Sequence, residues 1–172
     1  MLRIMRSLSQ LDFSQLMHVY EEGNISNGRE LYPHLSSYEQ LRMAEQDFYQ
    51  YLMTVFFRQK DSFYAVWELK GHYKAALRME PYSDGFLLCA LETAPDSREH
   101  GYATALVLEV LDYLSQQGSG TVYSHVSKRN QSSLAVHKKC GFEIIKDYAV
   151  YSDGSVLQNC FTLTNMYKKS ET

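Results

Sequence analysis

The segment from Arg98 to Ala103 holds the residues that point most directly to chemistry. It lies between an apolar, strand-like run and an amphipathic helix, and Gly101 stands where the helix opens. The free N–H groups at the start of a helix and the positive end of its dipole together form a socket for phosphate oxygens. Glycine lets the backbone approach a ligand without a Cβ in the way. We therefore predict that the chain binds a phosphate or pyrophosphate group at this loop.

Regular elements flank this loop in a definite order. An apolar strand at Phe86–Leu91 precedes it, apolar residues recur at helical spacing from Ala103 to Leu114, and Gly118 is placed to end that helix. A strand over Thr121–Val126 follows, and Asn130 can cap a further short helix. The pattern predicts a strand–loop–helix–strand–helix unit around the phosphate loop.

Three motifs in this order resemble the GNAT superfamily of N-acetyltransferases. The loop Arg98–Ala103 reads Arg-x-x-Gly-x-Ala, like the family's Arg/Gln-x-x-Gly-x-Gly/Ala. Val126 and Asn130 match an apolar residue and an asparagine on and after the family's fifth strand. Val136–Phe142 matches the closing segment, apolar-Tyr-x-x-apolar-Gly-Phe, with histidine in place of tyrosine. The resemblance is strong over Leu87–Phe142 and weak before it.

The resemblance implies an α/β fold of the acyl-CoA N-acyltransferase kind. We expect one domain over residues 1–172, with a central mixed, mostly antiparallel sheet of about seven strands and helices on both faces. The implied activity moves an acetyl group from acetyl-CoA to a primary amine by direct attack in a ternary complex. The alternative is a non-catalytic acyl-CoA-binding module of the same fold. Polyamines, aminoglycosides, amino acids and protein N-termini all remain open as acceptors.

By the same resemblance, the loop and the strand before it hold acetyl-CoA as co-substrate. In the family the strand splays from its neighbour, which would put the backbone of Leu91–Thr93 beside the thioester. Arg98 either contacts a phosphate or only braces the loop, and Asn130 either contacts the pantetheine arm or only caps its helix. Lys138 and Lys139 either reach the 3′-phosphate or are simply solvated. The residues expected to bind the cofactor are Leu91, Thr93, Arg98, Glu99, His100, Gly101, Tyr102, Ala103, Thr104 and Asn130.

Two residues are the candidates for proton transfer, and we predict that both are catalytic. Glu92 follows the apolar run, where desolvation would raise the pKa of a carboxylate and suit it to take a proton from an ammonium group. The alternative is that it points outward or pairs with a lysine. His137 stands where the family usually has its tyrosine acid. An imidazole can replace that phenol as proton donor to the departing thiolate, or merely fill its space.

Composition bears on several other classes of protein. The apolar fraction of 45% and the charged fraction of 22% are ordinary for a globular chain, and 172 residues suit one domain with a sizeable core. The net charge is −3 and no basic cluster is longer than two residues, which argues against nucleic acid as a partner. No apolar run approaches about 18 residues, so no membrane span is expected.

The cysteines and one further histidine suggest no other chemistry. Three widely spaced cysteines form no zinc-like set with histidine, so no metal is expected, and their odd number without a signal peptide indicates the cytoplasm. Cys89 fits a buried small hydrophobe better than a catalytic thiol. His125 fits a satisfied core or edge histidine. The expected partner is a small-molecule or peptide amine, and the resemblance is compatible with a homodimer.

The N-terminal part is expected to pack helices against the sheet. We predict a strand at Leu2–Met5, a helix capped by Asp12, a break at Gly23–Gly28, a connection at Arg29–Ser36 and a long helix started by a capping box at Ser37–Gln40. Four tyrosines near these helices either line an acceptor pocket or pack the helix pair: Tyr32, Tyr38, Tyr49 and Tyr51.

Alternating apolar residues predict the remaining strands. Two of them lie at Phe63–Leu69 and Tyr73–Met79, and a turn at Pro81–Gly85 leads into the central strand. At the end of the chain, Phe142–Tyr151 and Val156–Tyr167 are expected to form an antiparallel pair joined by an Asp-Gly hairpin turn.

Overall fold

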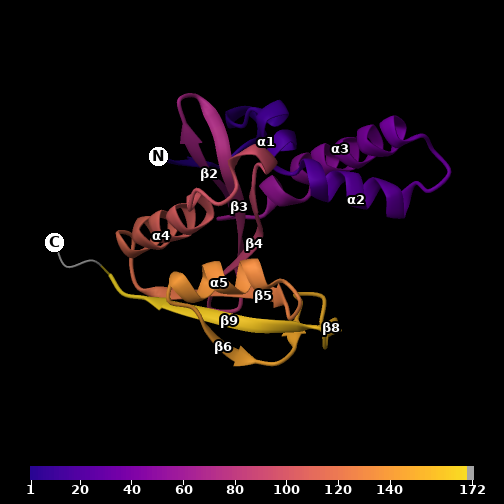
Figure 1. The fold of residues 1–172 in the computed structure, drawn as a ribbon. Helices are drawn as coiled ribbons and strands as arrows, with labels where there is room; N and C mark the ends of the chain where they lie inside the picture. The colour runs from indigo at the N-terminus through magenta and orange to yellow at the C-terminus, as the bar shows by residue number, and fades with distance from the viewer. Residues whose placement is uncertain (170–172) are drawn as a thin grey trace.

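The computed structural model describes residues 1–169 and consists of a central sheet with helices packed on both faces (Figure 1). The helices are α1 (Phe13–Val19), α2 (Glu21–Leu31), α3 (Ser37–Thr54), α4 (Tyr102–Ser115) and α5 (Gln131–Lys139), with short 3₁₀ turns η1 (Leu8–Gln10), η2 (Phe56–Arg58) and η3 (Pro95–Ser97). The strands are β1 (Leu2–Met5), β2 (Phe63–Leu69), β3 (His72–Tyr82), β4 (Gly85–Thr93), β5 (Gly120–Ser127), β6 (Glu143–Lys146), β7 (Ala149–Val150), β8 (Val156–Leu157) and β9 (Cys160–Tyr167).

Within residues 1–169, seven strands form the main sheet in the order β1-β2-β3-β4-β5-β9-β6. Every neighbouring pair is antiparallel except β4 and β5, which run parallel and are connected through α4. This confirms the expected mixed, mostly antiparallel sheet. β7 and β8 form a separate two-stranded hairpin.

Two apolar clusters cover the two faces of the sheet. On one face, Leu106, Val107 and Val110 of α4 pack on the central strands, together with residues of β5, β9 and the end of α5. On the other face, α1, α3 and η2 pack against the opposite side chains of β2 and β3, with Phe56 and Tyr64 fully buried. Because β-strand side chains alternate between faces, β3 supplies residues to both clusters.

The sheet opens in its middle, where β4 and β5 diverge. Their parallel pairing covers only Phe86–Leu88 against Val122–Ser124. A bulge then interrupts β4, with Ala90 at a φ of +51° and a register shift against β3. The hydroxyl of Tyr20, on the α1–α2 junction, donates a 2.7 Å hydrogen bond to the Ala90 carbonyl and so holds the bulge. A bulge bends its strand, and the splay implied by the family resemblance is confirmed.

The N-terminal helices differ from the prediction. Gly23–Gly28 is not a break but lies inside α2, which forms a hairpin with α3 that projects from the body (Figure 1). Gly28 is buried at the crossing, where an added Cβ would lie 2.5 Å from the Gln40 carbonyl oxygen. Gly28 is needed because the two helices pack closely. In the sequence alone, a glycine in this role cannot be told from one that ends a helix. The capping box is Ser36 with Glu39, one residue earlier than predicted.

Smaller corrections concern the ends of strands and helices. The turn before β4 consists of residues 83–84, because Pro81 extends β3. Gly118 lies beyond the end of α4 without the left-handed conformation of a C′ glycine, since the C-cap is Gln116. The expected long terminal pair is split, because β6 pairs with β9 whereas β7 pairs with β8 across the Asp-Gly turn.

Candidate active site

Two connected cavities lie where β4 and β5 diverge. The first, which we call the outer groove, has a volume of about 580 Å³ and runs between the end of β4, the Arg98–Ala103 loop and α5. The second, the inner cleft, measures about 330 Å³ and lies between the middle of β4 and β5. Both are lined by Leu91, Glu92, Asn130 and Ser133, so the cavities meet at these four residues.

The outer groove brings together nine of the ten predicted cofactor-binding residues. They are Leu91, Thr93, Arg98, Glu99, Gly101, Tyr102, Ala103, Thr104 and Asn130. His100 is the exception: it lines a different surface pocket with His72 and Lys74. Its ring stacks on that of Tyr102, and its Nδ1 lies 2.6 Å from the Arg98 carbonyl oxygen.

The loop leaves helix N–H groups open to the groove. Gly101 is the N-cap of α4 with a φ of +77°, and it provides no side chain to accept a hydrogen bond from the first turn. An added Cβ there would meet no atom within 4 Å. Because the first N–H groups of a helix have no partner within it, those of α4 remain available to an anion.

Arg98 braces the loop, which is one of the two roles predicted for it; the other is contact with a phosphate. Its Nη2 lies 2.6 Å from a carboxylate oxygen of Glu22 on α2, and this contact raises the pKa of the guanidinium. Both side chains are about half exposed, so the pair contributes little to stability by itself. Of the two lysines considered for the 3′-phosphate, Lys139 lines the outer groove.

Asn130 caps α5, as predicted. Its Oδ1 accepts a 3.0 Å hydrogen bond from the Ser133 N–H. This cap fixes the start of α5 beside the diverging edge of β5, so that Asn130 and Ser133 border both cavities. The cap explains the asparagine by itself and also puts its amide at the junction.

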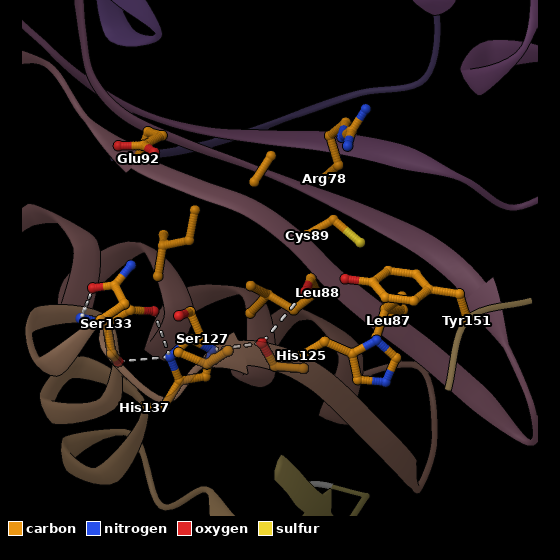
Figure 2. Close-up of a pocket in the computed structure, with 15 residues that line it drawn as sticks. Arg78, Leu87, Leu88, Cys89, Glu92, His125, Ser127, Ser133, His137 and Tyr151 are labelled. Carbon is orange, nitrogen blue, oxygen red and sulfur yellow. Dashed lines mark hydrogen bonds between the residues drawn. The ribbon is translucent and has the colours of Figure 1, made fainter. Parts of the chain in front are cut away.

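Glu92 lies on the β4 wall of that junction (Figure 2). Glu92 is exposed, although it lines both cavities. Partial desolvation there raises its pKa, the Arg98 guanidinium acts in the opposite direction, and the Glu22 carboxylate adds to the rise. The pKa of Glu92 is therefore raised, as expected, and solvent can still reach its carboxylate.

His137 lies on the opposite wall and is almost fully buried, with 1% of its surface exposed. Its Nδ1 is 2.8 Å from the Ser133 carbonyl oxygen, and its Nε2 is 2.8 Å from the Ser124 hydroxyl (Figure 2). A carbonyl oxygen only accepts hydrogen bonds, so Nδ1 carries the proton. Burial lowers the pKa of the ring, which keeps it neutral and leaves Nε2 to accept from Ser124.

Sequence reasoning missed Ser124, which connects His137 to the inner cleft. It is 2% exposed, lies on β5 at the last residue of the β4–β5 pairing, and lines the cleft. A serine within a strand carries no motif of its own. The one available signal was that an imidazole is shorter than the tyrosine it replaces, which calls for an intermediary.

The inner cleft also contains residues that no motif indicated. Arg78 of β3 and Tyr151 of the β7–β8 hairpin line it together with Cys89 and His125 (Figure 2). Burial raises the pKa of Cys89 to about 12, which supports its interpretation as an unreactive thiol. The expectation of a satisfied His125 is wrong, because both ring nitrogens are buried without a hydrogen-bond partner in the described chain.

The four tyrosines of the helical region stay outside both cavities. The Tyr32 hydroxyl donates a hydrogen bond to the Asp47 carboxylate, and the Tyr38 hydroxyl accepts one from the Arg42 guanidinium. The Tyr49 ring packs on the ring of Phe13. Tyr51 comes nearest, with its hydroxyl donating to Glu80 and its ring beneath the guanidinium of Arg78.

Residues 1–169 contain neither a cluster of metal ligands nor a helix that could span a membrane. No group of three His, Cys, Asp or Glu side chains is arranged as metal ligands would be. Every helix in this range is too short or too polar to cross a membrane.

Solved structures of acetyltransferases share this fold. The ribosomal-protein-S18-alanine N-acetyltransferase of Escherichia coli matches with a TM-score of 0.62 and 18% identity, covering 99% of this chain and 97% of its own. PaiA N-acetyltransferase of Thermoplasma acidophilum, solved with coenzyme A, matches with a TM-score of 0.63 and 13% identity. The match covers 97% of this chain and 99% of that protein's chain. Spermidine N-acetyltransferase of Vibrio cholerae, solved with CoA and spermine, matches with a TM-score of 0.62 and 16% identity. The match covers 98% of this chain and 96% of that protein's chain.

Comparison with curated protein sequences finds no match. A family model does match: residues 26–142, about two thirds of the chain, fit the Acetyltransferase (GNAT) family. The match spans the diverging strands, the Arg98–Ala103 loop and His137. With the fold, the loop and the divided sheet all in agreement, the chain belongs to the GNAT family of acetyltransferase enzymes.

Proposed function

We propose that this enzyme transfers an acetyl group from acetyl-CoA to a primary amine by direct attack within a ternary complex. The observation that carries the proposal is the meeting of the two cavities at Leu91, Glu92, Asn130 and Ser133. One cavity has the open N–H groups of a helix start and the other has a carboxylate at its mouth. Two substrates can therefore lie end to end with their reacting groups at the junction.

The residues of the outer groove fit acetyl-CoA. The first turn of α4 would bind the diphosphate, and Gly101 keeps that approach clear. Beyond Leu88 the edge of β4 facing β5 has no strand partner in the described chain, so its backbone can bind the pantetheine arm. When bound, acetyl-CoA supplies the thioester carbonyl that the amine attacks, and a backbone N–H of β4 near Leu91–Thr93 would donate to its oxygen.

Glu92 prepares the acceptor. An amine in water is mostly protonated and cannot attack, so one proton must leave first. A carboxylate with a raised pKa, open to solvent at the junction, can take that proton directly or through a water molecule. Solvent then carries the proton away.

Ser124 and His137 handle the second proton. Ser124 receives the proton that the attacking nitrogen releases, while its own hydroxyl proton passes to Nε2 of His137. The imidazolium formed in this way returns a proton through Ser124 to the leaving sulfur, so the proton count balances. A histidine whose pKa is lowered by burial serves this role because it holds the extra proton only briefly.

Direct attack is supported by the state of the nucleophiles in the cleft. Cys89 has a pKa of about 12 and is almost entirely protonated at neutral pH. We expect initial-rate patterns of a sequential mechanism. A ping-pong pattern with acetylated protein would contradict direct attack and would identify Ser124, which has a neutral histidine at 2.8 Å, as a nucleophile.

The binding proposal is tested with two glycine variants that differ only in location. Gly101 and Gly71 have φ values of +77° and +79°, and neither would bring a Cβ within 4 Å of another atom. Gly101→Asp adds a carboxylate at the anion site, whereas Gly71→Asp imposes the same strain in the β2–β3 turn. By calorimetry we expect Gly101→Asp to weaken acetyl-CoA binding about tenfold or more, and Gly71→Asp to leave it unchanged.

Two results would contradict the proposal. If purified protein gives no binding heat with acetyl-CoA, the outer groove has another ligand. If acetyl-CoA binds but no thiol is released with any amine, the chain is an acyl-CoA-binding module instead.

We further propose that residues 1–172 form one domain. We also propose that the protein acts in the cytoplasm, which the three unpaired cysteines support. Sedimentation of the purified protein tests the homodimer with which the family resemblance is compatible.

A further inference from the structure

The inner cleft has an unusual balance of charge for an enzyme that receives a cationic amine. Among the described residues that line it, the one acidic side chain is Glu92, at the junction with the outer groove. Farther along β4, the cleft is lined by the basic residues Arg78 and His125 and by the hydroxyl-bearing Tyr151 (Figure 2). A polyamine would meet a guanidinium there, which is unfavourable for a second positive charge.

Arg78 has more hydrogen-bonding capacity than its surroundings use. Its side chain is 17% exposed, and its Nε is buried without a hydrogen-bond partner in residues 1–169. Its carboxylate neighbour, Glu80, is 3.7 Å from Nε and also accepts from the Tyr51 hydroxyl. Tyr51 and Phe56 lie beneath the guanidinium plane and hold it in position. The guanidinium, which has five N–H donors, is thus held in position at the cleft and can still donate hydrogen bonds to a ligand.

His125 adds a second unsatisfied polar group. Both of its ring nitrogens are buried and unpartnered in the described chain, between the rings of Tyr82 and Tyr151. Leaving such groups without partners costs free energy, and a bound ligand is one of the few reasons to retain them. The Tyr151 ring reaches into the same end of the cleft, toward Cys89 (Figure 2).

The register of the sheet separates this basic end from Glu92. Arg78 pairs with Cys89 across β3 and β4, whereas Glu92 pairs with Ala76. Ala90 and Leu91 lie between Cys89 and Glu92, and the register against β3 places the two positions two residues apart along that strand, about 7 Å. The two ends of a simple α-amino acid are too close together to reach both positions.

Resting on the proposed acetyl transfer, we infer that the acceptor carries a carboxylate several bonds from its reactive amine, as in an ω-amino acid or a short peptide acid. The amine lies at Glu92. The carboxylate lies at the Arg78 guanidinium, with His125 and the Tyr151 hydroxyl as further donors. The arrangement disfavours spermidine and other polyamines.

The first test measures thiol release from acetyl-CoA with acceptors matched in length. The acids are glycine, 4-aminobutanoate, 6-aminohexanoate and glycylglycine, and each is compared with its carboxamide; spermidine is the cationic control. We expect kcat/KM to be about ten- to a hundredfold higher for a longer acid than for its amide, and glycine to be poor. Equal rates for acids and amides, or the highest rate with spermidine or glycine, would overturn the inference while leaving acetyl transfer intact.

The second test changes the residue responsible for the preference. In Arg78→Gln, the ratio of kcat/KM for acid over amide should fall toward one, and Arg78→Lys should retain part of it because the charge remains. Calorimetry with acetyl-CoA checks that each variant still forms the outer groove. An unchanged ratio in Arg78→Gln would overturn the inference. If acetyl-CoA binds but no acceptor in the panel releases thiol, the proposed transfer fails and this inference fails with it.

Discussion

At the scale of single residues, the site combines groups whose surroundings push their pKa values in opposite senses. Glu92 has a raised pKa and can hold a proton, whereas His137 has a lowered pKa and is kept neutral. Desolvation causes both shifts, because it disfavours the charged form of either group. Such a pair suits a reaction that removes one proton from a nitrogen and delivers another to a sulfur.

Replacement of Glu92 by glutamine should remove the base. The carboxylate acts only when ionised, so the wild-type kcat should rise as the pH increases through a pKa above 4.5. In Glu92→Gln we expect kcat to fall by a factor of about 10² to 10⁴ and this rise to disappear. Glu143→Gln, which changes an exposed carboxylate on β6, is the control. A variant that keeps the wild-type pH profile would exclude Glu92 as the base.

Replacement of Ser124 by alanine should interrupt the path between His137 and the cleft. We expect kcat to fall at least tenfold, with little change in acetyl-CoA affinity, because Ser124 lines the inner cleft and not the outer groove. Ser62→Ala is a matched control, since it removes another buried hydroxyl that donates to backbone carbonyls and lines neither cavity. Equal kcat in both variants would assign His137 and Ser124 to packing alone.

At the scale of elements, the α2–α3 hairpin shows how a local pattern can mislead. The run Gly-Asn-Ile-Ser-Asn-Gly has the composition of a loop but lies within α2. Tertiary packing outweighs its weak helix propensity, since Gly28 allows the backbone of α3 to approach closely. Arg98 pairs with Glu22 of this helix, which braces the Arg98–Ala103 loop.

Two alanine substitutions in α2 should therefore have opposite effects. Gly28→Ala would force a Cβ to within 2.5 Å of the Gln40 carbonyl oxygen, and we expect a loss of about 1–3 kcal/mol in the free energy of unfolding. At Gly23 a Cβ meets nothing within 4 Å, so Gly23→Ala should gain about 0.5–1 kcal/mol. Urea denaturation measures both. Stabilisation by Gly28→Ala would mean that the two helices pack less closely than described.

At the scale of the whole molecule, the sheet consists of two parts joined by a short parallel pairing. β1–β4 form one part and β5, β9 and β6 form the other, with Phe86–Leu88 and Val122–Ser124 as the strand contact between them. The diverging edges expose backbone groups that no strand within residues 1–169 satisfies. A ligand that binds along these edges would complete the hydrogen bonding of both parts.

Acetyl-CoA should therefore stabilise the chain as a whole. At a concentration one hundred times its Kd, a ligand that binds only the folded state adds about 2.7 kcal/mol. For a chain of this length, that corresponds to a rise in Tm of about 5–10 °C. Calorimetric scans measure the rise, and hydrogen exchange should slow along Cys89–Thr93 and the first turn of α4. Slower exchange confined to α2 and α3 would contradict the proposed binding mode.

The amino-acid sequence by itself determined the family and the order of most elements, and it predicted the Arg98–Ala103 loop as a phosphate site. These features depend on local residue types at fixed spacing, such as Gly101 before an amphipathic helix and Asn130 as a cap. Only the tertiary structure decided that Ser124 meets His137, that Arg98 pairs with Glu22, and that Arg78 and Tyr151 border the same cleft. These contacts join residues distant along the chain, and they follow from strand register and from a bulge held by Tyr20. No local pattern encodes such relations, because each depends on how separate elements pack together.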